Sequence, residues 1–492
     1  MKQFSAGATL QNYFLDSLAL SRQITKAEHR ANPFVNILNI SSKTAKQYPD
    51  LLRNKTLQWR LFHSCCGAAV NLLRSIMYAP HRIRLRPPTQ EIDVLVISHL
   101  IDKSHLDKET DFYFGNLGDV FEATSIKAHI VLINHCHADS RHLSKLNQTK
   151  KTVLPAFYSP SHEIKHIGRL LLASITLPKD RDKSLNKHFL RLARVAQFGG
   201  RAIGDFRIGK MVAEFIEITQ PRIVIHTYEG HGWEKIATSA AHSLPNRAHV
   251  IGYQHAVLSP GNKSLYYNHG GETAPDHIFT TGEFTRNELQ KNMLFLKHHI
   301  TAVGTFKNVT NRSGDTFKPN GTCLFAPEGT LDEIEILTRV AVNAARLDPT
   351  RKFVLRLHPV INSLQAQKIF SKFMPLSANF IVSSRALDDD IKAASWICYR
   401  GSSVSLQGIL AGLRPIFIGS DSDEYQNNPI PRDIAYLRVS RDANELISIL
   451  RHDKKYPMLA RQELVEAHTF ANQYFMPFKQ KVIINHINRH MK

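Results

Sequence analysis

From about residue 90 onward, short runs of apolar, β-prone residues alternate with longer segments of helical character. Apolar strands that alternate with helices are typical of parallel sheets covered on both faces. The sequence therefore predicts an α/β protein with two doubly wound, Rossmann-like sheets. The predicted strands are 93–98, 129–134, 151–154, 222–226, 249–253 and 277–280 in the first half, and 321–326, 352–357, 379–383, 395–399, 414–419 and 435–439 in the second.

The length of the chain agrees with more than one domain, because 492 residues exceed the size of an ordinary single domain. A polar stretch at 305–320 separates the two sets of strands and predicts an interdomain linker. We expect an N-terminal extension at 1–90, a first Rossmann-like domain at 91–305 and a second at 321–467. The remaining segment, 468–492, is predicted to form a helix that packs back on the domain junction.

The N-terminal extension does not share the strand–helix rhythm. Between residues 57 and 84, apolar clusters alternate with basic residues that include Arg60 and Arg74. One interpretation is a helix that lies on an anionic membrane. The other is an amphipathic helix packed on the first domain.

The chain is strongly basic, with 63 Lys and Arg against 42 Asp and Glu and a formal charge of +21. Such a charge favours anionic partners, which include nucleic acid, anionic lipid, nucleotide donors and acidic glycans. The N-terminus lacks the pattern of a secretory signal, and no run of 18 apolar residues predicts a spanning helix. The five cysteines show no zinc-binding spacing and are expected to be reduced thiols. We expect a cytoplasmic protein, either dissolved or peripheral at the inner face of the cell membrane.

Two polar loops of the first domain follow predicted strands, where open α/β sheets bind ligands. Glu229 lies directly before Gly230, and a second glycine follows His231. A carboxylate in this position suits a general base that acts on a sugar hydroxyl, with a helix cap as the alternative. His255 follows the next strand and is a second candidate base or a phosphate ligand, with a structural histidine as the alternative.

Polar loops also follow strands of the second domain. Arg356 and His358 precede Pro359, and alternation within a strand predicts that the two basic side chains share one face. Ser402 and Ser403 follow the next apolar run and open a helix, a pattern typical of an anion site. An ordinary Ser cap accounts for only one of the two serines.

A further acidic residue, Glu328, ends the first strand of the second domain. It is a candidate to bind a donor ribose, or it caps the following helix. The acidic run at 388–390 precedes a short helix and is explained by first-turn acids rather than by a metal site. The sequence contains no P-loop and no HExxH motif, and we assign it neither a metal nor a cofactor.

Together, the Glu-Gly, His-Pro and Ser-Ser segments resemble the motifs of bacterial sialyltransferases and polysialyltransferases with the GT-B fold. The resemblance implies that Glu229 is the base and that His358, Ser402 and Ser403 hold the phosphate of a CMP-sugar donor. The longer segment 227–235, followed by Gly-Tyr-Gln-His at 252–255, resembles bacterial surface-carbohydrate biosynthesis proteins. The pattern is also similar to CDP-glycerol and CDP-ribitol phosphotransferases, where the histidine that corresponds to His255 activates the acceptor.

The resulting hypothesis is a metal-independent GT-B glycosyltransferase whose two domains face a cleft. It transfers an acidic sugar, of the sialic, nonulosonic or Kdo-like class, from a CMP-activated donor to a glycan or lipid-linked acceptor. The product is a cell-surface polysaccharide such as lipopolysaccharide O-antigen or capsule. One alternative is a CDP-polyol phosphotransferase. Another is a non-catalytic nucleic-acid-binding protein, which accounts for the charge but not for the loops, and no aromatic–basic platform supports it.

Overall fold

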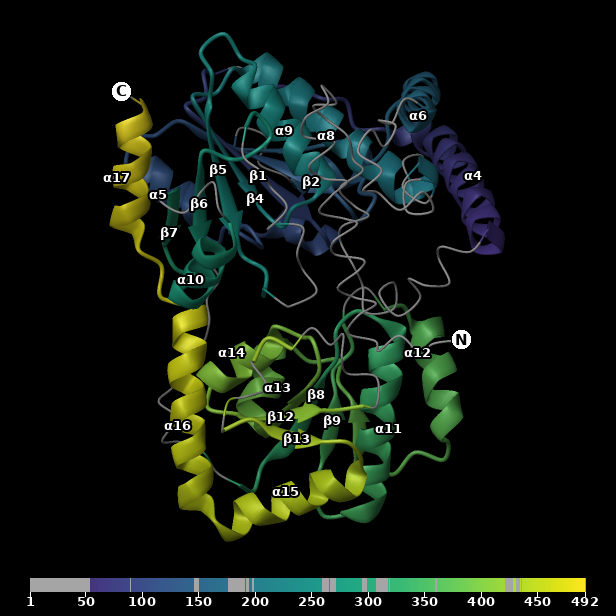
Figure 1. The fold of residues 1–492 in the computed structure, drawn as a ribbon, viewed down its shortest axis with the longest axis vertical. Helices are drawn as coiled ribbons and strands as arrows, with labels where there is room; N and C mark the ends of the chain where they lie inside the picture. The colour runs from purple at the N-terminus through teal and green to yellow at the C-terminus, as the bar shows by residue number, and fades with distance from the viewer. Residues whose placement is uncertain are drawn as a thin grey trace. The chain divides into compact units, whose positions relative to one another are not determined.

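The computed structural model describes residues 54–88, 90–145, 150–175, 191, 194–196, 199–258, 265, 271–293, 299–306, 317, 319–358, 361–420, 428–430, 434 and 436–491 (Figure 1). These residues form two compact units. The first takes in the described residues up to His255, those within 262–307, and those from Pro477 onward. The second takes in the described residues within 256–261 and 308–476. Most of the predicted linker lies outside the described residues.

The first unit contains a seven-stranded sheet in the order β3-β2-β1-β4-β5-β6-β7. Every neighbouring pair is parallel. Strands β2 and β3 lie on one side of β1, and strands β4 to β7 lie on its other side. The strands are β1 (Val94–Leu100), β2 (Ala128–Asn134), β3 (Lys151–Val153), β4 (Ile223–Thr227), β5 (His249–Gln254), β6 (His277–Thr280) and β7 (Ile300–Ala302).

Helices cover both faces of this sheet, and side-chain alternation within the strands explains why. In β1, Val94 and Val96 belong to the apolar core that includes residues of α5 and α17, whereas Leu95 and Ile97 belong to the core that includes residues of α8 and α9. A strand that buries both of its faces is therefore a nearly continuous apolar run. The helices of this unit are α4 (Asn54–Tyr78), α5 (Leu117–Ala123), α6 (Pro160–Ile175), α8 (Gly200–Thr219), α9 (Gly232–His242), α10 (Glu283–Asn292) and α17 (Gln480–Met491), with 3-10 turns η2 (Ala79–His81), η3 (Lys103–Asp107) and η4 (Ser140–Lys145).

The second unit contains a six-stranded parallel sheet in the order β10-β9-β8-β11-β12-β13. Its strands are β8 (Thr322–Ala326), β9 (Phe353–Leu355), β10 (Phe380–Val382), β11 (Ala394–Tyr399), β12 (Arg414–Ile418) and β13 (Arg438–Ser440). Its helices are α11 (Leu331–Leu347), α12 (Ser363–Phe370), α13 (Leu387–Ala393), α14 (Val404–Leu410), α15 (Ala443–Lys455) and α16 (Pro457–Tyr474), with the 3-10 turn η7 (Ser371–Phe373).

The predicted fold class is confirmed: two doubly wound, Rossmann-like parallel sheets, as in GT-B proteins, with a helical segment before the first sheet. Each of the twelve predicted strands has an observed counterpart. The short strand β7 was not predicted, because three residues are too few to show a period in the sequence. Strand β9 ends at Leu355, so Arg356 and His358 lie in the loop after it rather than on one face of a strand.

The C-terminal segment is divided between the two units. Helix α16 ends at Tyr474 in the second unit, and α17 begins at Gln480 in the first. Ile483 and Ile487 of α17 are fully buried in the core that also contains residues of β1 and β4. The last helix is therefore part of the first unit, although the whole second sheet precedes it in the chain.

Helix α4 packs against α6 and α8 largely with small and polar residues, together with Ala68. Ser64 and Ser75 are buried, and a Cβ atom on Gly67 would lie only 2.9 Å from the backbone nitrogen of Gly200. The Asn71 side chain accepts a 3.2 Å hydrogen bond from Arg207 of α8. Seven large apolar residues of α4 are exposed: Trp59, Leu61, Phe62, Val70, Leu73, Ile76 and Met77. Among the described helices, none is long and apolar enough to span a membrane.

The close contact between α8 and α9 predicts that Gly209 and Gly204, both in α8, differ in their tolerance of a larger side chain. A Cβ atom at Gly209 would lie 2.7 Å from Cδ1 and 2.8 Å from Cβ of Ile236, whereas one at Gly204 meets only a guanidinium nitrogen at 4.0 Å. We expect Gly209→Ala to lower the free energy of unfolding by roughly 1–3 kcal/mol through overpacking. Gly204→Ala, the matched control, should be neutral or stabilising by up to about 1 kcal/mol. Urea unfolding measures both, and equal effects of the two changes would contradict this account of the packing.

Candidate active site

Four adjacent strands of the first sheet bring polar side chains to their carboxyl ends. The strands are β2, β1, β4 and β5, which are neighbours in that order. His135 follows β2, His99 lies near the end of β1, Glu229 follows β4 and His255 follows β5. Because parallel strands end at the same edge of a sheet, residues far apart in the sequence meet here.

Glu229 lies between two imidazole rings. Its Oε1 atom is 3.0 Å from Nε2 of His255, and its Oε2 atom is 3.3 Å from Nε2 of His231. The side chain of Glu229 retains 28% of its accessible surface, whereas that of His255 retains 9%. The structure thus brings the two predicted catalytic residues together and adds His231, which the sequence analysis did not select as a site residue.

The loop that carries Glu229 is fixed by the carboxylate of Glu234, in the first turn of α9. Its Oε1 accepts a 2.9 Å hydrogen bond from the backbone N–H of Glu229, and its Oε2 accepts those of Gly230 at 2.8 Å and His231 at 3.0 Å. Gly230 has a φ of +83°, a conformation that side-chain-bearing residues rarely adopt. Glu234 is thus the acidic partner of a capping box whose N-cap residue is His231, and the side chain of Glu229 is directed to the two histidines.

Burial and hydrogen bonding shift the pKa values of Glu229 and His231 in opposite directions. Burial alone raises the pKa of Glu229, but hydrogen bonds from His231 and His255 outweigh it and hold the pKa well below its usual range. Burial alone lowers the pKa of His231, but the hydrogen bond to Glu229 and the nearby charge of Glu234 raise it to about 9. At neutral pH, Glu229 is therefore a carboxylate and His231 an imidazolium. Burial raises the pKa of Glu234 to about 8, against the pull of the positive His231 and the backbone N–H groups.

A second chain of hydrogen bonds adjoins Glu229. The two ring nitrogens of His99 lie 2.8 Å from Nε2 of His135 and 2.7 Å from Oγ1 of Thr227. Burial, followed by the neighbouring His135, lowers the pKa of His99 well below its usual range, so that this ring is neutral. The indole of Trp233 packs edge-on against His99.

Tyr113 packs against His255. Its ring centroid is 4.6 Å from that of His255. The loop that carries Tyr113 is held by the buried Asp111, which accepts hydrogen bonds from the backbone N–H of Tyr113 and from the hydroxyl of Ser98 on β1. Burial and the nearby Glu229 raise the pKa of the Tyr113 phenol, so it is neutral and not a base.

His99, His135, His231 and Tyr113 are residues that the sequence analysis missed. A signal existed for two of them, because His99 and His135 each stand at the carboxyl end of a predicted strand. Nothing local marks Tyr113, which lies in a loop 13 residues after the last residue of β1 and reaches the site only through tertiary packing.

In the second unit, Arg356 forms an ion pair with Asp390. One guanidinium nitrogen donates to the backbone carbonyl of Arg385 at 2.6 Å and to Oδ2 of Asp390 at 2.9 Å. Asp390 is buried and also accepts hydrogen bonds from the hydroxyl of Ser383. This residue of the 388–390 acidic run therefore orients an arginine at the end of β9. His358 lies two residues further on and is exposed. Pro359 lies outside the described residues.

Glu328, after β8, meets the loop after β11. A Cβ atom on Gly401 would lie 2.6 Å from a carboxylate oxygen of Glu328, so a larger residue at this position would require the Glu328 side chain to move. Burial and the nearby Glu333 raise the pKa of Glu328 to about 7, against the opposing effect of Arg400. Glu328 is therefore able to exchange a proton or to donate a hydrogen bond near neutral pH.

The two serines differ in their surroundings. Ser402 is buried, and its hydroxyl accepts a 3.3 Å hydrogen bond from the backbone N–H of Val404. Ser403 is partly exposed at the start of α14 and makes no side-chain cap. Of the predicted donor-site residues, Glu328, Arg356, Ser402 and Ser403 thus lie at or just beyond the carboxyl ends of the neighbouring strands β8, β9 and β11.

The sequence matches no model of a known protein family and no curated protein. Among solved structures, it is similar to UDP-GlcNAc 2-epimerase from Neisseria meningitidis, with 11% identity and a TM-score of 0.46 over 80% of this chain and 99% of that one. It is also similar to MnaA of S. aureus, with 10% identity and a TM-score of 0.48 over 81% and 96%. A third is the glycosyltransferase SnogD from Streptomyces nogalater, with 14% identity and a TM-score of 0.43 over 82% and 100%.

The raised pKa of His231 predicts a dependence of stability on pH. Protonation of this ring stabilises the fold fully below its ordinary pKa of 6.5, and the effect is lost as the pH rises through about 9. The shift corresponds to roughly 3 kcal/mol at most. We expect urea unfolding to show wild type more stable than His231→Gln at pH 6, with the difference shrinking by pH 9.5. His81→Gln, an exposed control in η2, should show no such trend. A pH-independent difference for His231→Gln would contradict the assignment of a buried charged pair.

Proposed function

We propose that this protein is a glycosyltransferase that takes a sugar from a nucleotide-activated donor. The donor is a CMP-linked acidic sugar, and the product is a cell-surface polysaccharide. The observation that carries the proposal is the ionised carboxylate of Glu229 held 3.0 Å from His255 at the carboxyl edge of a parallel sheet. A carboxylate paired with an imidazole is a common way to accept a proton from a hydroxyl group.

The hydrogen bond between the two residues determines which nitrogen accepts the proton. An ionised carboxylate only accepts hydrogen bonds, so Nε2 of His255 carries the hydrogen in this pair. In the neutral ring, the lone pair is then on Nδ1. Because His231 and His255 hold the pKa of Glu229 well below its usual range, the carboxylate itself is a weak base. We therefore assign proton acceptance to Nδ1 of His255 and the orientation of the ring to Glu229.

In the reaction, the acceptor hydroxyl attacks the anomeric carbon of the donor sugar. The bond between that carbon and the phosphate oxygen breaks, and the electron pair leaves with CMP. The hydroxyl proton passes to His255, and the resulting imidazolium is stabilised by the negative charge of Glu229. His231, which is already an imidazolium, keeps Glu229 ionised throughout.

The second unit supplies the groups proposed for the nucleotide. Arg356, oriented by Asp390, and the hydroxyls of Ser402 and Ser403 are donors suited to phosphate oxygens. Glu328, whose pKa is raised to about 7, is suited to bind ribose hydroxyls in either protonation state. The formal charge of +21 favours the approach of an anionic donor and an anionic glycan.

A nucleotide screen joined to a transfer assay tests this function. We expect CMP to raise the melting temperature of the protein more than CDP, UDP or GDP, since ligand bound only by the folded state stabilises it. Ser402→Ala combined with Ser403→Ala should weaken this stabilisation. Glu229→Gln and His255→Gln should each lower kcat for sugar transfer by roughly 10²–10⁴ while CMP binding is unchanged.

The screen and the transfer assay test the proposed function and the proposed residue roles independently. His81→Gln is the control and should transfer at the wild-type rate, because its side chain is exposed in η2. Transfer that survives in both Glu229→Gln and His255→Gln would refute the base assignment but leave the transferase intact. Stabilisation by UDP alone would change the donor class, and transfer of a polyol phosphate from a CDP donor would replace glycosyl transfer by phosphotransfer. Stabilisation by no nucleotide would contradict the proposal as a whole.

We also propose that the outward face of α4 binds an anionic membrane, where a lipid-linked acceptor would reside. The exposed fractions of Trp59, Leu73 and Met77 are 60%, 59% and 80%. The sequence of α4 contains no Asp or Glu, and Arg60 and Arg74 supply positive charge. The neighbouring α6 adds exposed apolar residues, Ile164, Leu171, Leu172 and Ile175. Apolar side chains flanked by basic ones are typical of helices at a membrane surface.

Vesicle flotation measures this binding. We expect the protein to float with vesicles that contain phosphatidylglycerol and much less with pure phosphatidylcholine, since each basic residue near an anionic surface contributes about 1 kcal/mol. Trp59→Ser combined with Met77→Ser should weaken binding by roughly tenfold or more, since burial of apolar surface contributes about 25 cal/mol per Å². Leu364→Ser, which removes a side chain that is 75% exposed on α12, is the matched control. Equal losses in the two variants would refute a specific role for α4.

A further inference from the structure

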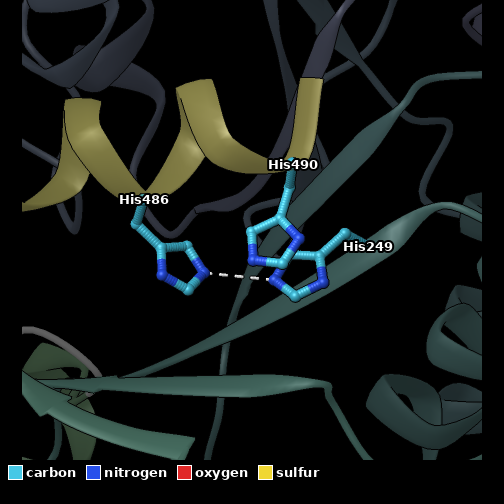
Figure 2. A group of neighbouring side chains, drawn as sticks. All are labelled: His249, His486 and His490. Atoms are coloured by element: carbon cyan, nitrogen blue, oxygen red, sulfur yellow. Dashed lines mark hydrogen bonds between the residues drawn. The ribbon is translucent and has the colours of Figure 1, made fainter. Parts of the chain in front are cut away.

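Three histidines meet where the last helix crosses the first sheet. His249 is the first residue of β5, and His486 and His490 lie one turn apart on α17, on the side that faces the strand (Figure 2). Their nearest ligand atoms all lie within 4.8 Å of one another. The Nε2 atoms of His249 and His486 are 3.1 Å apart, and the rings of His249 and His490 stack with centroids 3.6 Å apart.

These distances are close to those of a metal site. A tetrahedral zinc ion with bonds of about 2.0–2.1 Å to imidazole nitrogen holds its ligand atoms about 3.3 Å apart. The pair of His249 and His486 already has this separation. His490 is exposed near the end of α17, so its ring has room to turn away from the stacked position and toward the other two.

A carboxylate lies behind the ring of His249. The Nδ1 atom of His249 is 3.7 Å from Oδ2 of Asp276, an ion-pair rather than a hydrogen-bond distance, whereas its Nε2 atom faces His486. Asp276 is itself fixed by the backbone N–H of Val250 at 2.8 Å and by Arg247 at 2.7 Å. A carboxylate behind a ligating histidine is a recurring arrangement in metal sites.

The helix that carries the other two ligands is anchored independently of any ion. Ile483 and Ile487, one turn apart, are fully buried in the core of the first sheet. Near the end of α17, the guanidinium of Arg222 donates a 2.9 Å hydrogen bond to the carbonyl of Met491. His486 and His490 are therefore held over β5 in a fixed register, which reduces the entropy lost when an ion binds.

We propose that His249, His486 and His490 form a binding site for a divalent transition-metal ion of the zinc class. Imidazole ligands suit zinc, copper and nickel, and three histidines leave a fourth position for water. The ion fastens the C-terminal helix to β5. It thereby links the end of the chain to the strand that leads into His255, and its role is structural.

Zinc titration of untagged, chelator-treated full-length protein tests the site. We expect isothermal titration calorimetry to show one ion bound per chain, a rise in melting temperature with zinc, and a visible absorption spectrum of tetrahedral type with cobalt. His486→Gln and His490→Gln should each weaken zinc binding by roughly tenfold or more. His490→Gln alters an exposed side chain, so its melting temperature without zinc should equal that of wild type.

Two control variants separate this site from other histidines of the protein. His81→Gln removes an exposed imidazole of η2, and Glu229→Gln removes the carboxylate between His231 and His255. Both should bind zinc as wild type does. Loss of zinc binding in Glu229→Gln but not in His490→Gln would move the ion to the candidate active site and overturn the proposal. Absence of stoichiometric binding in wild type, or equal affinity in wild type and the combined His486→Gln and His490→Gln variant, would also overturn it.

Discussion

The side-chain carboxyl group of Glu234 accepts hydrogen bonds from three consecutive backbone N–H groups, and the candidate active site depends on this interaction. It is present because α9 begins directly after the loop, which places the first-turn acid beneath the amides of residues 229–231. With the backbone fixed, the side chain of Glu229 does not cap the helix and instead reaches His231 and His255. The two imidazoles keep it ionised, although it is largely removed from water.

The proximity of the site residues follows from the strand order of the first sheet. Strands β2, β1, β4 and β5 are adjacent, so the ends of segments separated by more than 100 residues become neighbours. The same sheet explains the position of α17, whose buried isoleucines need an apolar face that the first unit supplies. The proposed metal site and the candidate active site therefore lie on one framework, with β5 carrying His249 at its start and leading to His255 after its end.

Much of the fold could be predicted because parallel strands buried on both faces are mostly apolar and stand out between amphipathic helices. The same logic placed Glu229, His255, Arg356 and Ser402 at strand ends. It did not predict that Glu234 holds the backbone amides of the loop while Glu229 turns to the two histidines, since both acids lie near the start of α9 and only the loop geometry distinguishes them. It also misplaced the end of β9, because Arg356 and Leu357 continue the strand pattern while the strand ends at Leu355 and the N–H of Arg356 donates its last backbone hydrogen bond to β8.

The sequence by itself determined the class of fold, the number of sheets and most of the residues at the carboxyl ends of the strands, because these follow from local periodicity and from where each apolar run stops. The tertiary structure alone decided which side chains meet. It paired Glu229 with His231 and His255, turned the apolar side of α4 outward, and set two histidines of α17 against His249. Apart from the local pair of Glu229 and His231, these arrangements depend on strand order and helix packing between segments distant in the chain, which no local pattern encodes.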